Sequence, residues 1–293
     1  MSPHVGLRAA DLDDPARGVR VPVTLLYPAR TLGAAVRFGP YQIVAARDAA
    51  PDGERMPLVV VSHGTGGSPY TYRDLASHLA RAGFAVALVV HPGNNRDDDR
   101  LARTVQNLED RPRHLRLAID AAYGDAVVGP RLRPDAVAVV GHSMGGYTAL
   151  AVAGGRPMSS PHDTPSGPPQ PVPVTRDARV RALVLLAPAT VWYAHEGALS
   201  EVRVPILLRT GEKDELAPPF FGDLVVNGVA DAAAVDHAVV PGAGHFAFMT
   251  PFPAQMARPG FLPAQDPEGF DRAAYLPGLY AEVEAFLRRV LAG

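Results

Sequence analysis

The sequence predicts an α/β fold in which a mostly parallel central sheet is flanked by helices on both faces. Short runs of apolar and β-branched residues alternate with longer segments of helical periodicity, which is the pattern of successive βα units. A Gly-x-Ser-x-Gly pentapeptide at 141–145 stands between one apolar run and one helical segment. The 293 residues carry apolar segments evenly along their length, so we expect a single domain over residues 1–293.

Seven short apolar segments have the length and the residue types of strands. Several of them are apolar throughout, as expected for strands that are buried on both faces of a parallel sheet. The predicted strands are residues 21–27, 58–62, 85–90, 136–140, 182–187, 206–210 and 235–240.

Longer segments between these strands have helical spacing. The predicted helices are residues 70–82, 100–108, 112–123, 147–153 and 276–291. Pro112 is expected to begin a new helix, because proline is tolerated in a first turn but not in a helix interior. The last helix has one apolar face, formed by Leu279, Val283, Phe286, Leu287 and Val290.

Residues 156–177 form a proline-rich insertion directly after the helix that follows the serine. The segment contains seven prolines and almost no apolar periodicity, so we expect an irregular excursion. It is either a lid over a binding pocket or a solvated loop, and the sequence leaves both interpretations open.

Composition narrows the function classes. The formal net charge is −2, and no basic stripe is present, which argues against nucleic-acid binding. Cysteine is absent, so disulfides, thiolate metal sites and cysteine nucleophiles are excluded. No apolar run approaches the length of about 18 residues that a membrane span needs, so we expect no membrane insertion. A cytoplasmic location is the default prediction, or secretion if a signal peptide has been removed.

The pentapeptide Gly141-His142-Ser143-Met144-Gly145 has the form of a nucleophile elbow. In such a turn a strand passes directly into a helix, and the serine is held in a strained backbone conformation that small neighbours make possible. The strand predicted at 136–140 and the helix predicted at 147–153 supply this context. Ser143 is therefore the candidate nucleophile.

A serine nucleophile needs a general base and an acid that orients the base. Asp214 and His245 follow two successive predicted strands, in the chain order serine, acid, histidine. All three side chains are therefore expected at the carboxyl edge of the sheet, where ligands gather in α/β folds. Glu212 and Glu215 are alternative acids.

The glycine-rich segment 62–68 begins at the end of the strand predicted at 58–62. Its backbone N–H groups could stabilise the negative charge that develops on a substrate carbonyl oxygen. We assign the two donors of this oxyanion hole to the backbones of Thr65 and Met144. A phosphate cradle and a simple tight turn are the alternatives, and the segment lacks the lysine and spacing of a P-loop.

Other polar and aromatic residues lie near these positions in the sequence. His63 and His91 are expected to line or brace the pocket, while His142 is expected to point away from the nucleophile and either to support the site or to pack. Core packing is the alternative for about half of the predicted pocket residues. The predicted pocket residues are His63, Tyr70, His142, Trp192, Tyr193, Phe246, Phe248 and Met249.

No metal site or cofactor is predicted. The acidic run Asp97-Asp98-Asp99 could ligate a hard cation, but its spacing does not match an EF-hand loop. Three acids before a helix are more often surface charges that favour the helix dipole.

The chain has a candidate nucleophile elbow, a candidate acid, a candidate histidine base and the glycine-rich segment 62–68, which we call the glycine loop. With these features it resembles serine esterases of the α/β-hydrolase superfamily. More narrowly, it resembles bacterial predicted dienelactone hydrolases, a group related to platelet-activating-factor acetylhydrolases. The matching segments are residues 27–29, 39–41, 62–68, 75–84, 91–94, 141–146 and 242–248. The resemblance implies an α/β-hydrolase fold and ester hydrolysis through an acyl-enzyme, with Ser143 attacking, His245 moving the proton and Asp214 orienting His245.

Substrate class stays open at this point. Dienelactone hydrolases use a cysteine nucleophile, which this chain lacks, so the group name does not specify a substrate. A weaker similarity to cutinase-like enzymes rests mainly on Gly-His-Ser-Met-Gly-Gly at 141–146. We expect a carboxylic-ester hydrolase for small to medium acyl groups, with a small-molecule ester as its partner. Lactone hydrolysis, acyl transfer and polyester hydrolysis are the alternatives, and a non-catalytic binding protein is the contrasting class. Oligomeric state is not predicted.

Overall fold

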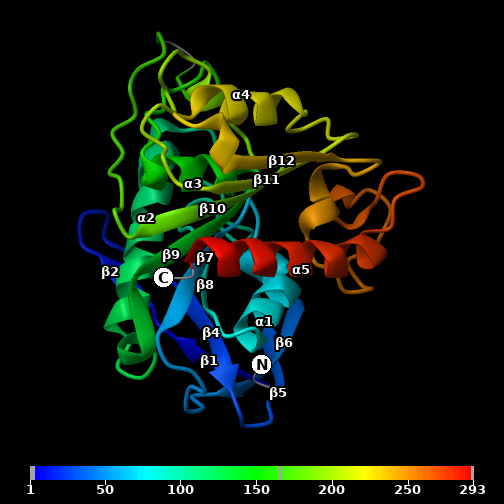
Figure 1. Ribbon diagram of the computed structural model, residues 1–293. Helices are drawn as coiled ribbons and strands as arrows, with labels where there is room; N and C mark the ends of the chain where they lie inside the picture. The colour runs from blue at the N-terminus through cyan, green and yellow to red at the C-terminus, as the bar shows by residue number, and fades with distance from the viewer. Residues whose placement is uncertain (1–3, 165–166, 292–293) are drawn as a thin grey trace.

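The computed structural model describes residues 4–164 and 167–291 and is built around one ten-stranded sheet (Figure 1). The strands lie in the order β12-β11-β10-β9-β7-β8-β4-β1-β6-β5, and β2 and β3 form a separate two-stranded sheet. The strands are β1 (His4–Ala9), β2 (Leu12–Asp14), β3 (Val19–Val21), β4 (Val23–Ala29), β5 (Ala34–Phe38), β6 (Tyr41–Arg47), β7 (Met56–Ser62), β8 (Ala85–Val89), β9 (Leu132–His142), β10 (Val180–Leu186), β11 (Ile206–Gly211) and β12 (Val235–Val240).

Six neighbouring strands, β7 to β12, pair in parallel throughout. The predicted mostly parallel sheet is therefore confirmed, and β4 joins it by antiparallel pairing with both β8 and β1. The strand predicted at 21–27 is not continuous, so this prediction is wrong at its first two residues. Pro22 separates β3 from β4, because proline has no N–H to contribute to a strand ladder.

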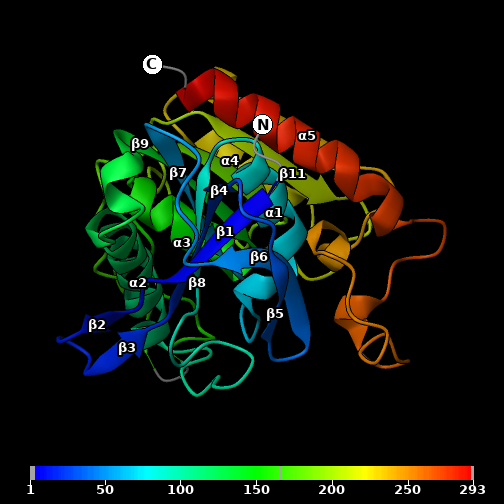
Figure 2. The ribbon, with the colours of Figure 1, turned by 90° about the horizontal axis from the view of Figure 1, so that it is seen from below.

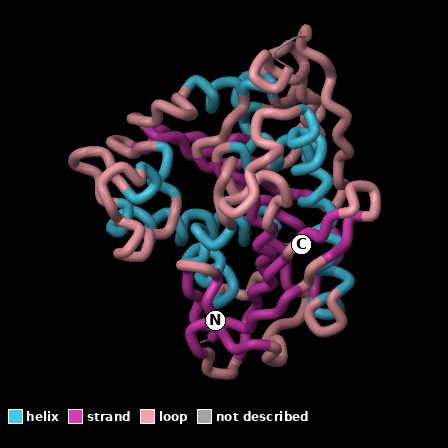
Figure 3. The backbone as a smooth tube through the Cα atoms, turned by 180° about the vertical axis from the view of Figure 1, so that it is seen from behind, coloured by secondary structure: helices cyan, strands magenta, loops and turns pink. Residues whose placement is uncertain are grey.

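Alternating side chains of the central strands feed two apolar layers. In β7, Leu58 and Val60 belong to one core cluster, whereas Val59 and Val61 belong to the other. Helices α2 (Val105–Gly124), α3 (Met144–Ala153) and α4 (Phe220–Gly228) contribute to the first cluster. Helices α1 (Arg73–Arg81) and α5 (Arg272–Leu291) contribute to the second. Helices thus cover both faces of the sheet (Figures 2 and 3), as the sequence predicts.

The helices predicted at 100–108 and 112–123 form one continuous helix, α2, which begins at Val105 rather than at residue 100 and contains Pro112. A proline at 112 cannot donate to the carbonyl of Leu108 four residues earlier. That carbonyl is instead satisfied by the hydroxyl of Tyr147, which donates to it over 2.9 Å from α3. A tertiary contact that is invisible in the local sequence therefore allows the helix to continue through the proline.

The insertion at 156–177 is irregular, but its described residues are well anchored. Its two arms pair through Ser159 N–H to the Gln170 carbonyl at 2.8 Å and Val172 N–H to the Pro157 carbonyl at 2.9 Å. The Trp192 indole N–H donates to Asp163 over 2.8 Å and fastens the insertion to the body of the protein. Among the described residues, no helix is both long and apolar enough to cross a membrane.

Candidate active site

Ser143 lies at the junction of β9 and α3 and has a backbone φ of 53° and ψ of −121°. A positive φ is unusual for a residue with a side chain and marks a strained position. The turn is fixed by backbone hydrogen bonds: Ser143 N–H donates to the Leu186 carbonyl at 3.1 Å, and the Ser143 carbonyl accepts from Ala189 at 2.9 Å. The strain predicted for a nucleophile elbow is present at this serine.

The two glycines of the pentapeptide are required by close backbone contacts. A β-carbon added at Gly145 would lie 1.9 Å from the Ser62 carbonyl oxygen, and one added at Gly141 would lie 2.2 Å from the Gly145 carbonyl oxygen. Any side chain at either position would clash with backbone, which cannot move aside cheaply. The Gly-x-Ser-x-Gly spacing therefore has a direct steric cause.

Asp214 and His245 form a buried pair. The Nδ1 atom of His245 lies 2.7 Å from Oδ2 of Asp214, and the two side chains are only 7% and 0% exposed. Backbone N–H groups of Leu216 and Ala217 donate to the other carboxylate oxygen at 2.9 and 2.7 Å. A carboxylate held by three donors fixes the histidine ring, with Nδ1–H facing Asp214 and Nε2 left as the proton acceptor.

The alternative acids lie elsewhere. Glu212 accepts from the Gly242 N–H at 2.7 Å in an exposed turn, and Glu215 lines a surface cavity. Of the three carboxylates in this segment, the structure brings Asp214 to His245.

The serine elbow and the histidine loop are tied together through His142. Its Nε2 lies 2.9 Å from the His245 carbonyl oxygen and donates to it, and the two imidazole centroids are 4.8 Å apart. His245 begins a short 3-10 helix, η5 (His245–Phe248), directly after β12. Because β9, β11 and β12 are parallel, Ser143, Asp214 and His245 all follow strand ends at the same edge of the sheet.

The glycine loop after β7 packs directly against the serine. A β-carbon on Gly64 would lie 3.2 Å from Cβ of Ser143. Residues 64–67 form a tight turn closed by the Gly67 N–H and the Gly64 carbonyl at 3.2 Å, with Gly66 at a φ of 56°. Thr65 stands at the exposed tip of this turn. Met144 is the first residue of α3, where backbone N–H groups have no partner within the helix.

The structure separates the predicted pocket residues into three groups. His63, His142, Tyr193 and Phe248 are at most 3% exposed, and Met249 is 6% exposed, so these five side chains are buried. Tyr70 and Phe246 line separate cavities. Trp192 packs edge-on against Tyr147 and holds the insertion.

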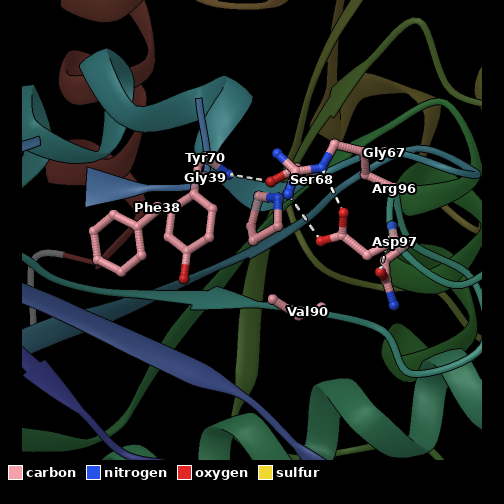
Figure 4. Close-up of a pocket in the computed structure, with 10 residues that line it drawn as sticks. Phe38, Gly39, Gly67, Ser68, Tyr70, Val90, Arg96 and Asp97 are labelled. Atoms are coloured by element: carbon pink, nitrogen blue, oxygen red, sulfur yellow. Dashed lines mark hydrogen bonds and ion pairs between the residues drawn. The ribbon is translucent and has the colours of Figure 1, made fainter. Parts of the chain in front are cut away.

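Two cavities flank the glycine loop and the histidine. One, of about 170 Å³, lies beside Gly67 and Ser68; it is bordered by the stacked rings of Phe38 and Tyr70 and by the Arg96–Asp97 ion pair (Figure 4). The other, of about 230 Å³, lies beside His245. The apolar side chains that line this second cavity are Leu216, Phe246, Ala247, Leu262 and Pro267.

A buried polar cluster lies on the inner side of the glycine loop, and two of its members, Arg111 and His114, are not predicted from the sequence. Burial lowers the pKa of His63 and of His114 to about 3, and it lowers the pKa of His91 well below its usual range. These histidines are therefore neutral at pH 7. The guanidinium of Arg111 lies among them, fully buried. No local pattern marks Arg111, because its partners come from distant segments of the chain.

The acidic run at 97–99 is used for local hydrogen bonds. Asp98 accepts from the Gly93 N–H at 3.1 Å, and Asp99 accepts from the Asn94 amide at 2.6 Å. Across residues 4–164 and 167–291, no group of three or more histidines and acids is arranged to hold a metal ion.

Comparisons with known proteins agree with this architecture. Residues 57–192 match the sequence profile of the family described as alpha/beta hydrolase fold. The chain is 27% identical over 197 residues to Cutinase 2 of Thermobifida cellulosilytica, an alignment that covers 64% of this chain and 60% of the cutinase. A similar match to the cutinase of Thermobifida fusca (strain YX) covers 64% of this chain and 49% of that protein. The chain thus spans about half to three fifths of these relatives.

Solved structures with the same fold cover nearly the whole chain. A ferulic acid esterase from Streptomyces cinnamoneus superposes with a TM-score of 0.69 at 22% identity and covers 99% of this chain and 90% of its own. Dienelactone hydrolase from Anabaena variabilis gives a TM-score of 0.59 at 17% identity, with coverages of 98% and 99%. The fold expected from the sequence is confirmed.

Proposed function

We propose that this chain, which has the α/β-hydrolase fold, is a serine carboxylic-ester hydrolase that acts on small to medium acyl esters through an acyl-enzyme. The observation that carries the proposal is the strained φ of 53° at Ser143, on a sheet edge shared with the 2.7 Å His245–Asp214 pair. Similarity to cutinases, at 27% identity, supports the same reaction class.

The proposed reaction has two halves. Ser143 Oγ attacks the ester carbonyl while His245 Nε2 takes its proton, and Asp214 stabilises the imidazolium that forms. The backbone N–H groups of Thr65 and Met144 stabilise the oxyanion. Collapse of the tetrahedral intermediate breaks the bond to the alcohol, which leaves with the proton from His245. Water, deprotonated by His245, then attacks the acyl-serine and releases the carboxylic acid.

The first test is the hydrolysis of p-nitrophenyl esters from acetate to palmitate, by the wild type and by Ser143→Ala. We expect the wild type to show a chain-length optimum and Ser143→Ala to lose at least about 10³-fold in kcat, as a nucleophile should. Ser200→Ala, a change outside the site, is the matched control and should retain full activity. A fluorophosphonate should label the wild type at one site and fail to label Ser143→Ala. An unimpaired Ser143→Ala would refute the serine mechanism.

Polyester hydrolysis is the second candidate. Leu216 and Leu262 line the cavity beside His245 and are 62% and 66% exposed, so apolar surface adjoins the proposed reaction centre. A solid polyester could lie on such a surface, and the cutinase similarity points the same way. The test is release of acid from polyester particles by the wild type and by Leu262→Ser; equal rates on particles would remove the support that the exposed leucines give.

A further inference from the structure

Arg111 is a buried cation whose direct partners are neutral. Its side chain is 0% exposed on α2. Within the described ranges, the acceptors of its hydrogen bonds are the Thr148 hydroxyl at 3.1 Å, the Asn94 amide oxygen at 2.6 Å, the Ser62 hydroxyl at 3.4 Å and the His63 carbonyl. Burial lowers the pKa of Arg111 to about 9, which leaves it charged at pH 7. Burying a charge without a carboxylate in contact is costly, so this placement calls for a physical reason.

One arm of the network reaches the glycine loop. Arg111 binds the carbonyl of His63, which belongs to the same peptide group as the Gly64 N–H. It also binds the side-chain oxygen of Asn94, and the Asn94 amide donates to the Thr65 hydroxyl over 2.8 Å. Arg111 therefore contacts the loop backbone at His63 and is linked to the Thr65 side chain through Asn94.

The other arm reaches the helix that carries Met144. Arg111 Nε donates to the Thr148 hydroxyl, and that hydroxyl donates to the Met144 carbonyl over 3.0 Å. The two backbone groups assigned to the oxyanion hole, on Thr65 and Met144, belong to different segments of the chain. One rigid guanidinium thus connects both segments, which a planar fork of donors can do and a single ammonium group cannot do equally well.

The groups around Arg111 leave its positive charge in place beside the glycine loop. His63, His91 and His114 are neutral in the folded protein, so the charge of this cluster comes from Arg111. Asp99, the carboxylate that Asn94 contacts, is separated from Arg111 by that side chain. A positive charge on the buried side of the loop favours negative charge that develops on its other side.

We propose that Arg111 is a positioning residue that sets the two halves of the oxyanion hole, acting on Thr65 through His63 and Asn94 and on Met144 through Thr148. It does not touch the substrate. The proposal rests on the proposed ester hydrolysis, and it assigns a function to a residue that lies outside the triad and outside both cavities.

The test compares Arg111→Met and Arg111→Lys with the wild type, using p-nitrophenyl butyrate and a trifluoromethyl ketone that forms an oxyanion when bound. We expect Arg111→Met to lose about 10- to 100-fold in kcat, the scale of a misplaced catalytic group, with KM changed less than about threefold. Affinity for the ketone should fall in parallel with kcat/KM, because both depend on the oxyanion site. Arg111→Lys, which keeps the charge but not the fork, should fall between the two.

Arg113→Met is the matched control. Arg113 lies on the same helix and pairs with the buried Asp14, so its loss removes an ion pair without touching the loop. It should lower the melting temperature and leave kcat unchanged. A folded Arg111→Met with wild-type kcat, or a loss of kcat shared by Arg113→Met, would overturn the proposal.

If Arg111→Met does not fold, Asn94→Ala provides the test, because it removes the link between Arg111 and Thr65, together with the Asn94–Asp99 hydrogen bond, and leaves Arg111 in place. We expect about a tenfold loss of kcat from this variant, with KM nearly constant. Unchanged kcat in folded Asn94→Ala and in Arg111→Lys would contradict the positioning role. If the chain is not a serine ester hydrolase, the wild type will show no activity that Ser143→Ala abolishes. If only the role of Arg111 is wrong, that activity will be present and will not depend on Arg111.

Discussion

At the scale of single residues, the site is fixed before any substrate binds. Both oxygens of Asp214 are occupied, one by His245 and the other by two backbone N–H groups. The imidazole cannot rotate without breaking a buried, charge-assisted contact. Such preorganisation is what a catalytic base needs, because a small misplacement of a reacting group costs a large factor in rate.

Substituting Asp214 by asparagine tests this orientation. An amide can donate to Nδ1 and so favour the wrong tautomer of His245, and we expect kcat to fall by about 10⁴-fold. Glu212→Gln, the matched control in the same segment, should stay within about threefold of the wild type because Glu212 bonds only to an exposed turn. Steady-state rates on one p-nitrophenyl ester measure both. Equal losses in the two variants would mean that the acid has been assigned wrongly.

The sequence is enough to propose some residues of the site and not others. Ser143, Asp214 and His245 each follow a strand, so strand ends and spacing suffice to propose them as a group. Arg111 could not be proposed in this way. Its partners are on α3, in the loop after β7 and in the loop after β8, and only the folded chain brings these segments together.

At the scale of elements, α2 and α3 are joined by an unusual hydrogen bond. Pro112 leaves the Leu108 carbonyl without its helical donor, and the Tyr147 hydroxyl takes that place at 2.9 Å. The Tyr147 carbonyl in turn accepts from the Tyr193 hydroxyl at 2.9 Å. The helix that begins at the elbow is thereby held against the helix that carries Arg111.

A double-mutant cycle tests this link. Tyr147→Phe leaves a buried carbonyl unsatisfied and should lower the free energy of unfolding by about 1–3 kcal/mol. In a Pro112→Ala background the backbone N–H of residue 112 can satisfy Leu108, so the same change should cost about 1 kcal/mol less. Tyr123→Phe, which removes a hydroxyl bonded to the Arg133 carbonyl, is the control and should cost the same in both backgrounds. Urea unfolding gives all the values, and zero coupling for Tyr147 would refute the compensation.

The boundaries of strands can be predicted where the local sequence decides them, and not where pairing with distant strands decides them. β12 lies where it is predicted, at 235–240, and β7, β8 and β11 differ from prediction by one or two residues. These strands are continuous apolar runs, which have a clear local signal. Strands β1, β5 and β6 are missing from the prediction, because their pairing is decided by other strands of the sheet. Helix α4 is missing as well.

At the scale of the whole molecule, the chain buries four histidines in neutral form. Burial lowers the pKa of His63, His114 and His142 to about 3, and it lowers the pKa of His91 well below its usual range. Unfolded, each has a pKa of about 6.5 and takes up a proton below that value. The unfolded chain therefore binds more protons than the folded chain between about pH 6.5 and pH 3, so acid favours unfolding over this range. Stability from this source is fully present above about pH 6.5.

Each such histidine costs about 1.4 kcal/mol of unfolding free energy for every pH unit below 6.5, until its folded pKa is reached. The three histidines with a folded pKa of about 3 together reach about 6 kcal/mol at about pH 5, and His91 adds to this in the same direction. This is comparable to the whole stability of a typical protein. We therefore expect the protein to approach acid unfolding near that pH.

His114 is the histidine with which to measure this effect, because neither ring nitrogen has a hydrogen-bond partner in the described structure. Its pKa falls to about 3 through burial and the nearby Arg111. His114→Leu removes one protonation from the unfolded state, so the loss of stability between about pH 7.5 and pH 5 should shrink by about 2 kcal/mol. Urea unfolding at the two pH values gives the difference, and any offset that is independent of pH cancels. Tyr123→Phe, which removes no histidine, is the control and should leave the pH dependence over this range as in the wild type. The same pH dependence in His114→Leu as in the wild type would mean that His114 is protonated alike in the folded and unfolded chains, and the cluster beneath the glycine loop would then carry more positive charge than Arg111 alone.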